Sequence, residues 1–141
     1  MQKTLIDAGP LIALFDGSDA WHEKVVGFLK NYRGALVTTW PVITEATHML
    51  DFSVEAQTDL LTWIDQGGIE LFDLHAGHLE RLIALAKKYA DLPMDLADGS
   101  LIVAAETLGT RDILTIDSDY DIYRTLKKEA FRNVLKESLH I

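Results

Sequence analysis

The chain has 141 residues, of which 48% are hydrophobic, and no cysteine; this composition predicts one globular domain over 1–141 and excludes disulfides, thiolate-bound zinc and extensive disorder. No apolar run approaches the about 20 residues of a membrane span, and no basic and apolar leader opens the sequence, so we expect a cytoplasmic protein. The formal net charge of −9 weighs against nucleic-acid binding, but four acids assigned to divalent cations would leave only −5, and charge alone does not decide.

The first predicted strand ends on an acid. Apolar residues at 4–6 stop at Asp7, and a short turn leads to Pro10. Proline suits the first turn of a helix, here predicted over 11–15, because its missing N–H is not needed there. In an open sheet of parallel strands, ligands bind beyond the carboxyl ends of the strands. Asp7 therefore marks a candidate site.

Strand and helix patterns alternate along the rest of the chain. In order, the sequence predicts a helix over 20–32, a strand over 35–37, helices over 41–50 and 53–64, a strand over 69–72, helices over 79–89 and 94–109, a strand over 111–116, a helix over 122–128 and a final strand over 133–135. This alternation predicts a parallel sheet covered by helices on both faces. The almost wholly apolar helix over 94–109 should lie in the middle of a layer.

Four carboxylates occupy informative positions. Asp7 follows the first strand, Glu45 lies on the helix after the second strand, Asp98 lies in the first turn of the apolar helix, and Asp117 follows the fourth strand. Mg²⁺ and Mn²⁺ prefer oxygen ligands. Acids packed together without a cation would repel one another and raise one another's pKa. The four acids therefore predict a Mg²⁺ or Mn²⁺ site at one edge of the sheet.

Two of these acids have a purely structural alternative. Asp7 stands beside a Gly-Pro turn, where aspartate is a common helix cap. Glu45 could be an ordinary solvated residue, although a helical wheel places it nearer Val42 and Met49 than the polar side of the helix. Both readings stay open at the level of sequence.

Asp95 and Asp98 are expected to differ in role. Asp95 directly precedes the apolar helix, which is the N-cap position, whereas Asp98 falls at the third helical position and shares a face with Ile102. The neighbouring Gly99 costs about 1 kcal/mol of helix stability relative to alanine, which indicates that something approaches this turn closely. We expect Asp98 to be a ligand and Asp95 a cap.

Other polar residues near these acids are less informative. Thr115 could donate a hydrogen bond to a ligating carboxylate, and Asp119 fits a turn. His75 and His78 are three residues apart, but the sequence offers no third metal ligand beside them. We therefore expect no histidine metal site.

Basic residues gather late in the chain, on the helix predicted over 122–128. Arg124, Lys127 and Lys128 would share one face, which could meet phosphates or could simply be solvated. No glycine-rich phosphate loop and no serine or cysteine nucleophile motif accompanies them.

Four segments carry a resemblance to a known family: IDAGPLIALFD, TTWPVITEA, PMDLADGSLIVAAE and ILTIDSDYDIYR. In this order they resemble PIN-domain proteins, which include the VapC toxins of toxin–antitoxin pairs. The resemblance implies a Rossmann-like α/β/α domain of three layers with a parallel sheet of four to five strands. By motif position it places the family's acidic quartet on Asp7, Glu45, Asp98 and Asp117. Gly9 departs from the pattern, because many members carry a serine or threonine there that could steady the first acid or the metal.

The resemblance also implies an activity. It suggests a Mg²⁺- or Mn²⁺-dependent endoribonuclease that hydrolyses RNA with the quartet as metal ligands, an antitoxin protein as partner, and a homodimer. One alternative is a PIN-fold module that binds RNA or a partner with little turnover. Another is a phosphotransfer or receiver-like domain, which is disfavoured because no DxD motif follows the first strand directly and no lysine is placed after a later strand.

Overall fold

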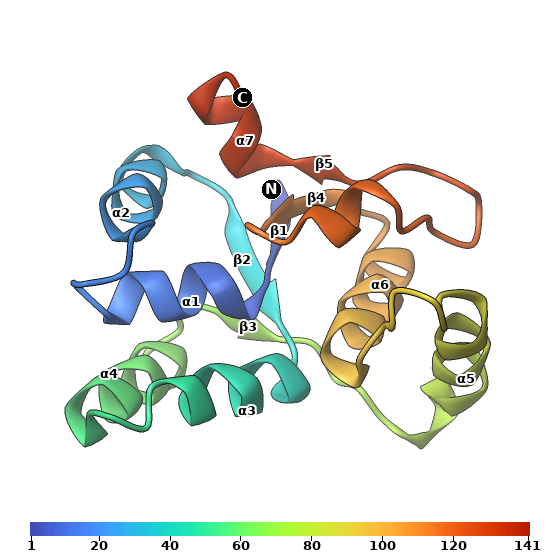
Figure 1. Cartoon of the computed structure of the whole chain (residues 1–141), viewed down its shortest axis with the longest axis horizontal. Helices are drawn as coiled ribbons and strands as arrows, with labels where there is room; N and C mark the ends of the chain where they lie inside the picture. The colour runs from blue at the N-terminus through green and yellow to red at the C-terminus, as the bar shows by residue number, and fades with distance from the viewer.

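The structure is a computed structural model that describes all residues, 1–141 (Figure 1). The strands are β1 (Lys3–Ile6), β2 (Ala35–Thr38), β3 (Glu70–Leu71), β4 (Asp112–Leu114) and β5 (Arg132–Asn133). The α-helices are α1 (Ala8–Phe15), α2 (His22–Asn31), α3 (Trp40–Met49), α4 (Val54–Asp65), α5 (Leu79–Lys88), α6 (Leu96–Leu108) and α7 (Val134–Leu139). Two 3₁₀ helices, η1 (Ala76–His78) and η2 (Ser118–Asp121), complete the elements.

The strands form one sheet in the order β3-β2-β1-β4-β5, and every pairing is parallel. At the centre, Leu5 pairs with Val37 on one side and with Ile113 on the other. The predicted parallel sheet of four to five strands is confirmed. Because all strands run the same way, their carboxyl ends share one edge, and the loops that follow β1 and β4 are neighbours there.

Helices pack on both sides of this sheet, which confirms the three-layer α/β/α architecture. Helix α1 packs against α2, α3 and α4, whereas α5 packs against α6, and α7 contacts β4. Figure 1 shows α1, α2, α3 and α4 on one side of the sheet and α5 and α6 on the other. None of the helices is both long enough and apolar enough to cross a bilayer.

The core is continuous through the sheet and includes most of α6, as its apolar sequence predicts. Every residue from Ala97 to Ala105 is buried. The close approach indicated at Gly99 comes from α5: a Cβ at this position would lie 3.3 Å from Cδ2 of Leu82. The glycine therefore serves helix packing rather than ligand access.

Two predicted elements near the carboxyl terminus are wrong. The segment 122–128 is a tight loop instead of a helix, with Arg124 bridged to Ala130 and Lys128 at a φ of +64°. The final strand is confined to β5, and α7 follows it at once because the Asn133 side chain accepts a hydrogen bond from the amide of Lys136 as its N-cap. The basic residues of the loop therefore do not share a helix face.

Candidate active site

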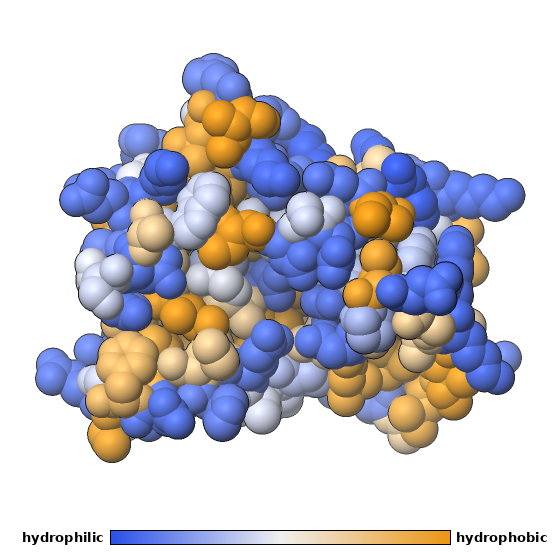
Figure 2. Space-filling view, in the orientation of Figure 1, coloured by the Kyte–Doolittle hydropathy of each residue, from blue (hydrophilic) through white to orange (hydrophobic).

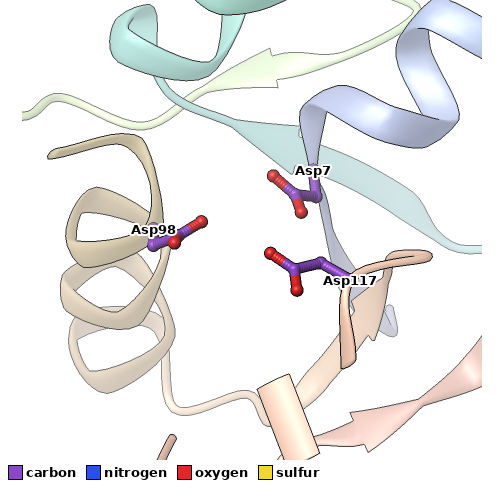
Figure 3. A group of neighbouring side chains, drawn as sticks. All are labelled: Asp7, Asp98 and Asp117. Atoms are coloured by element: carbon purple, nitrogen blue, oxygen red, sulfur yellow. The ribbon is translucent and has the colours of Figure 1, made fainter. Parts of the chain in front are cut away.

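Three aspartates from three separate elements meet at the carboxyl edge of the sheet. Asp7, Asp98 and Asp117 each offer one carboxylate oxygen that lies within 4.8 Å of the other two. Figure 3 shows their side chains pointing toward one another from the end of β1, the first turn of α6 and the loop after β4. The arrangement brings together residues 110 positions apart in sequence, as the shared edge of parallel strands requires.

Local structure fixes the backbone under each of the three acids. Asp7 is the N-cap of α1, and its side chain accepts a hydrogen bond from the amide of Ala8 at 2.8 Å. The amide of Asp98 donates to the N-cap Asp95 at 2.8 Å, which confirms the predicted cap. Asp117 caps η2 and accepts from the amide of Asp119. Capping and site formation are therefore not alternatives for these residues.

The electrostatics of the cluster disfavour the charged forms of its buried members. Burial raises the pKa of Asp7 to about 6, and the charges of Glu45 and Asp117 add to this while hydrogen bonds from Ala8 and Thr115 oppose it. Burial raises the pKa of Asp98 to about 7, and the charge of Asp95 is the next cause. Such raised values are typical of carboxylates held together for a function.

The donors that contact these aspartates are all neutral. Thr115 Oγ1 donates to Asp7 at 2.9 Å, as the sequence suggested, and a tyrosine hydroxyl donates to Asp98 at 2.9 Å. None of the ion pairs of the structure involves Asp7, Asp98 or Asp117. The cluster thus has oxygen ligands, partial desolvation and no compensating side-chain cation, which is a donor set that fits a hard divalent cation.

Glu45 lies beside this cluster and not within it. It stands on an exposed face of α3, and together with Asp95 it lines a groove of about 680 Å³ between α3 and the start of α6. Partial desolvation of its carboxylate raises the pKa of Glu45, and the charges of Asp95, Asp98 and Asp117 raise it further. The helical wheel was wrong to group it with a buried face, because Val42 is buried whereas Glu45 and Met49 are exposed.

Sequence reasoning missed two residues of the site, Tyr120 and Tyr123. Both are buried, and their hydroxyls lie 3.4 Å and 2.9 Å from the two carboxylate oxygens of Asp98. The available signal was their spacing of three residues directly after Asp117, together with the tendency of a buried tyrosine hydroxyl to find a polar partner.

The match to known families covers most of the chain. The model of the PIN domain family matches residues 4–126. The chain belongs to the PIN-domain family. This membership excludes the receiver-like alternative, and it agrees with a β1 that ends on one acid and lacks the DxD arrangement.

Proteins similar to this PIN domain include a ribonuclease and a toxin of known structure. The chain is 30% identical over 115 residues to Ribonuclease VapC26 of Mycobacterium tuberculosis. The aligned residues cover 80% of this chain and 85% of that protein. Its fold is similar to the crystal structure of VapC20 of Mycobacterium tuberculosis, described as a sarcin-ricin loop cleaving toxin, with a TM-score of 0.76 and 13% identity over 84% of this chain and 92% of that one. At this identity the second comparison supports the fold alone.

The departure of this PIN domain at Gly9 has a packing reason. A Cβ added there would lie 2.6 Å and 2.9 Å from Cγ1 and Cδ1 of Ile116, the residue before Asp117. An isoleucine side chain therefore fills the space that a residue with a hydroxyl would need. The site compensates in part, because Thr115 supplies a hydroxyl to Asp7 from β4.

The neighbouring histidines His75 and His78 take part in local hydrogen bonds. Nδ1 of His75 accepts from the amide of Gly77, and Nδ1 of His78 accepts from the amide of His75, so that both rings cap η1. Their role in this PIN domain is structural.

Proposed function

We propose that this PIN-domain protein is a Mg²⁺- or Mn²⁺-dependent endoribonuclease and the toxin component of a VapBC-type toxin–antitoxin pair. The observation that carries the proposal is the convergence of Asp7, Asp98 and Asp117 within 4.8 Å at the carboxyl edge of the sheet. The similarity to Ribonuclease VapC26 over most of both chains supports the choice of RNA as substrate. Capping alone does not account for all three side chains, because three buried or half-buried carboxylates repel one another unless a cation joins them.

The acids of the quartet have separate tasks in this proposal. Asp7, Asp98 and Asp117 would hold the ion, and each is fixed by a hydrogen bond from a neutral group. Glu45 lies beside them on α3, in the groove that it lines with Asp95, and its carboxylate would orient the attacking water and accept its proton. When bound, the ion supplies positive charge that activates water and offsets the charge of the phosphodiester. No histidine takes part.

Because the protein is acidic, the proposal requires the cation for RNA binding as well as for hydrolysis. The chain carries a net charge of −9, and no lysine or arginine pairs with the central acids. A polyanion would be repelled from this edge in the absence of metal. Binding of RNA near the site should therefore depend on Mg²⁺ or Mn²⁺, even when cleavage is blocked.

The proposal includes two protein partners. An antitoxin would neutralise the enzyme by a peptide that lies along the active-site groove, and the enzyme itself would form a homodimer. Light scattering of the purified chain, alone and after co-expression with the protein encoded beside it, measures both assemblies.

A nuclease assay on structured RNA tests the proposed reaction. Wild-type protein, the variant Asp98→Asn and the control Asp121→Asn are compared in Mn²⁺ and in EDTA. The control removes the same charge from an exposed residue of the neighbouring turn, whose carboxylate pairs with Lys136 at 3.6 Å. We expect cleavage by the wild type and the control in Mn²⁺ only, and a loss of at least about 100-fold in Asp98→Asn.

Each other outcome has a definite meaning. Cleavage that persists in EDTA, or in Asp98→Asn, would refute the metal mechanism. Wild-type protein that binds RNA in Mn²⁺ without cutting it would favour a binding module over an enzyme.

A further inference from the structure

Two tyrosine hydroxyls face the carboxylate of Asp98, one on each oxygen. Tyr123 Oη donates to Oδ2 at 2.9 Å, and Tyr120 Oη lies 3.4 Å from Oδ1. Both tyrosines are buried. The shorter bond has the length of an ordinary O–H···O hydrogen bond, whereas the longer one is weak. Asp98 thus has a defined orientation, set mainly by Tyr123.

The tyrosines are themselves held rigidly. Their rings meet edge to face with centroids 5.0 Å apart, and Tyr89 packs on Tyr123 at the same separation. Arg124 fixes the backbone around them, because its Nη1 donates to the carbonyls of Asp121 and Tyr123 at 2.8 Å. Tyr123 therefore cannot follow Asp98 if that carboxylate rotates.

The chemistry of the donor suits a metal ligand. A carboxylate oxygen has two lone pairs, so one hydrogen bond leaves a second lone pair free for a cation. A hydroxyl is neutral and leaves the negative charge of Asp98 in place, whereas a lysine or arginine at this position would compete with the cation. Groups behind a metal ligand that fix its orientation commonly contribute strongly to metal affinity.

We propose that Tyr123, assisted by Tyr120, is a positioning residue that holds the Asp98 carboxylate in the orientation that receives the divalent cation. Because the role of Asp98 as a metal ligand is part of the proposed function, the inference depends on that function. It adds a requirement beyond the acidic quartet: the segment that follows Asp117 must orient the Asp98 carboxylate.

The variant Tyr123→Phe removes one hydroxyl and keeps the ring. Tyr89→Phe is the matched control, because it also removes one hydroxyl from a buried tyrosine of the same ring cluster, and that hydroxyl does not contact Asp98. Calorimetric titration with Mn²⁺ measures the dissociation constant of each variant. We expect Tyr123→Phe to weaken Mn²⁺ binding by about 10- to 100-fold, Tyr120→Phe to weaken it less, and Tyr89→Phe to leave it within about twofold. Ribonuclease activity of Tyr123→Phe should recover toward the wild-type value as the Mn²⁺ concentration is raised.

Two results would overturn the inference. One is Mn²⁺ affinity in Tyr123→Phe that stays within twofold of the wild type. The other is an equal loss in Tyr89→Phe, which would assign the effect to packing of the ring cluster instead of to the bond with Asp98.

A readout that needs neither metal nor RNA separates this inference from the proposed function. Crystal structures of metal-free wild type and Tyr123→Phe show the orientation of the Asp98 carboxylate directly. We expect a rotated carboxylate in the variant only, and an unchanged carboxylate would refute the positioning role. A wild-type protein that binds no Mn²⁺ and cuts no RNA would end the proposed function, while this comparison would still decide what holds Asp98.

Discussion

Thr115 connects two of the central acids through one hydroxyl group. Its Oγ1 donates to Oδ2 of Asp7 at 2.9 Å and accepts from the amide of Asp117 at 3.0 Å. Asp7 follows β1 and Asp117 follows β4, and these strands are neighbours in the sheet through the pair Ile6 and Leu114. The hydroxyl therefore sets the relative position of two carboxylates that the backbone ladder only brings near.

Replacement of Thr115 by valine tests this connection. Valine has nearly the same shape but no hydroxyl, so Asp7 loses a donor and the amide of Asp117 loses an acceptor. We expect Mn²⁺ affinity to fall by about tenfold, and the free energy of unfolding to fall by about 1 kcal/mol because the half-buried amide of Asp117 loses its acceptor. Calorimetric titration and denaturant unfolding measure the two effects.

Thr110→Val is the control for this change. Thr110 Oγ1 donates to the carbonyl of Lys3 at 2.8 Å and accepts from the amide of Asp112, at the opposite end of β4. The Thr110→Val variant should lose stability but keep the Mn²⁺ affinity of the wild type. Equal Mn²⁺ affinities in Thr115→Val and the wild type would contradict the role of the hydroxyl.

The pKa of Asp98 predicts how the stability of the metal-free protein changes with pH. Burial and the neighbouring carboxylates raise this pKa from 3.8 to about 7. The folded protein therefore holds the proton more tightly than the unfolded chain, and the free energy of unfolding falls as the pH rises from about 4 to about 7. A variant without a charge at position 98 should therefore not lose this stability as the pH rises.

Thermal unfolding in EDTA measures this effect in wild type and Asp98→Asn. At pH 5 the two Tm values should be close, and at pH 8 the variant should unfold about 5 °C higher, because an amide has no charge that burial penalises or that Asp95, Asp7 and Asp117 repel. Addition of Mn²⁺ at pH 8 should raise the Tm of the wild type only. A variant that is less stable than the wild type at pH 8 in EDTA would contradict the prediction that the partly buried charge of Asp98 destabilises the metal-free protein.

The convergence of the acids could be predicted from sequence because it follows from topology. Asp7 directly follows β1, and Asp117 lies shortly after β4. The carboxyl ends of parallel strands share one edge of the sheet, whatever the details of side-chain packing. Asp98 was identifiable because its N-cap, Asp95, defines where α6 begins. These sequence signals are local. The alternation of strands and helices predicts the parallel sheet that brings the acids to one edge.

The segment 122–128 could not be predicted because a distant contact decides it. Its residues favour a helix locally, but the amide of Leu126 donates to Glu106 of α6, which also forms a bidentate pair with Arg81 of α5. Lys128 adopts a left-handed conformation that closes the turn. The same limit hid the roles of Tyr120 and Tyr123, since only the folded loop aims their hydroxyls at Asp98.

Glu45 should differ from the three aspartates when it is replaced. It is exposed and lies outside the close cluster, so Glu45→Gln should leave Mn²⁺ affinity within about threefold and lower RNA cleavage by about 100-fold, as loss of a group that orients and deprotonates water would do. Parallel measurement of Mn²⁺ binding and single-turnover cleavage separates the two roles. Glu55→Gln, on the exposed first turn of α4, is the control and should change neither. A loss of Mn²⁺ affinity as large as that of Asp98→Asn would instead make Glu45 a direct ligand.

The pairing of Gly9 with Ile116 predicts a compensated double substitution. Gly9→Ser introduces the hydroxyl that many PIN domains carry, but its Cβ would come within 2.9 Å of two Ile116 side-chain atoms. We expect the single variant to lose about 1 to 3 kcal/mol of stability from overpacking and to lose activity, because Ile116 adjoins Asp117. Ile116→Ala opens the space, so Gly9→Ser with Ile116→Ala should be more stable than the sum of the two single changes by about 1 kcal/mol or more.

Denaturant unfolding of the four proteins gives this coupling free energy, and Mn²⁺ titration shows whether the added hydroxyl serves the site. Because Thr115 already donates to Asp7, the double variant should regain Mn²⁺ affinity without exceeding the wild type by more than about threefold. Gly17→Ser is the control, since a Cβ at Gly17 meets no atom within 4 Å. Strict additivity of the two single substitutions would mean that Ile116 is not what keeps residue 9 a glycine.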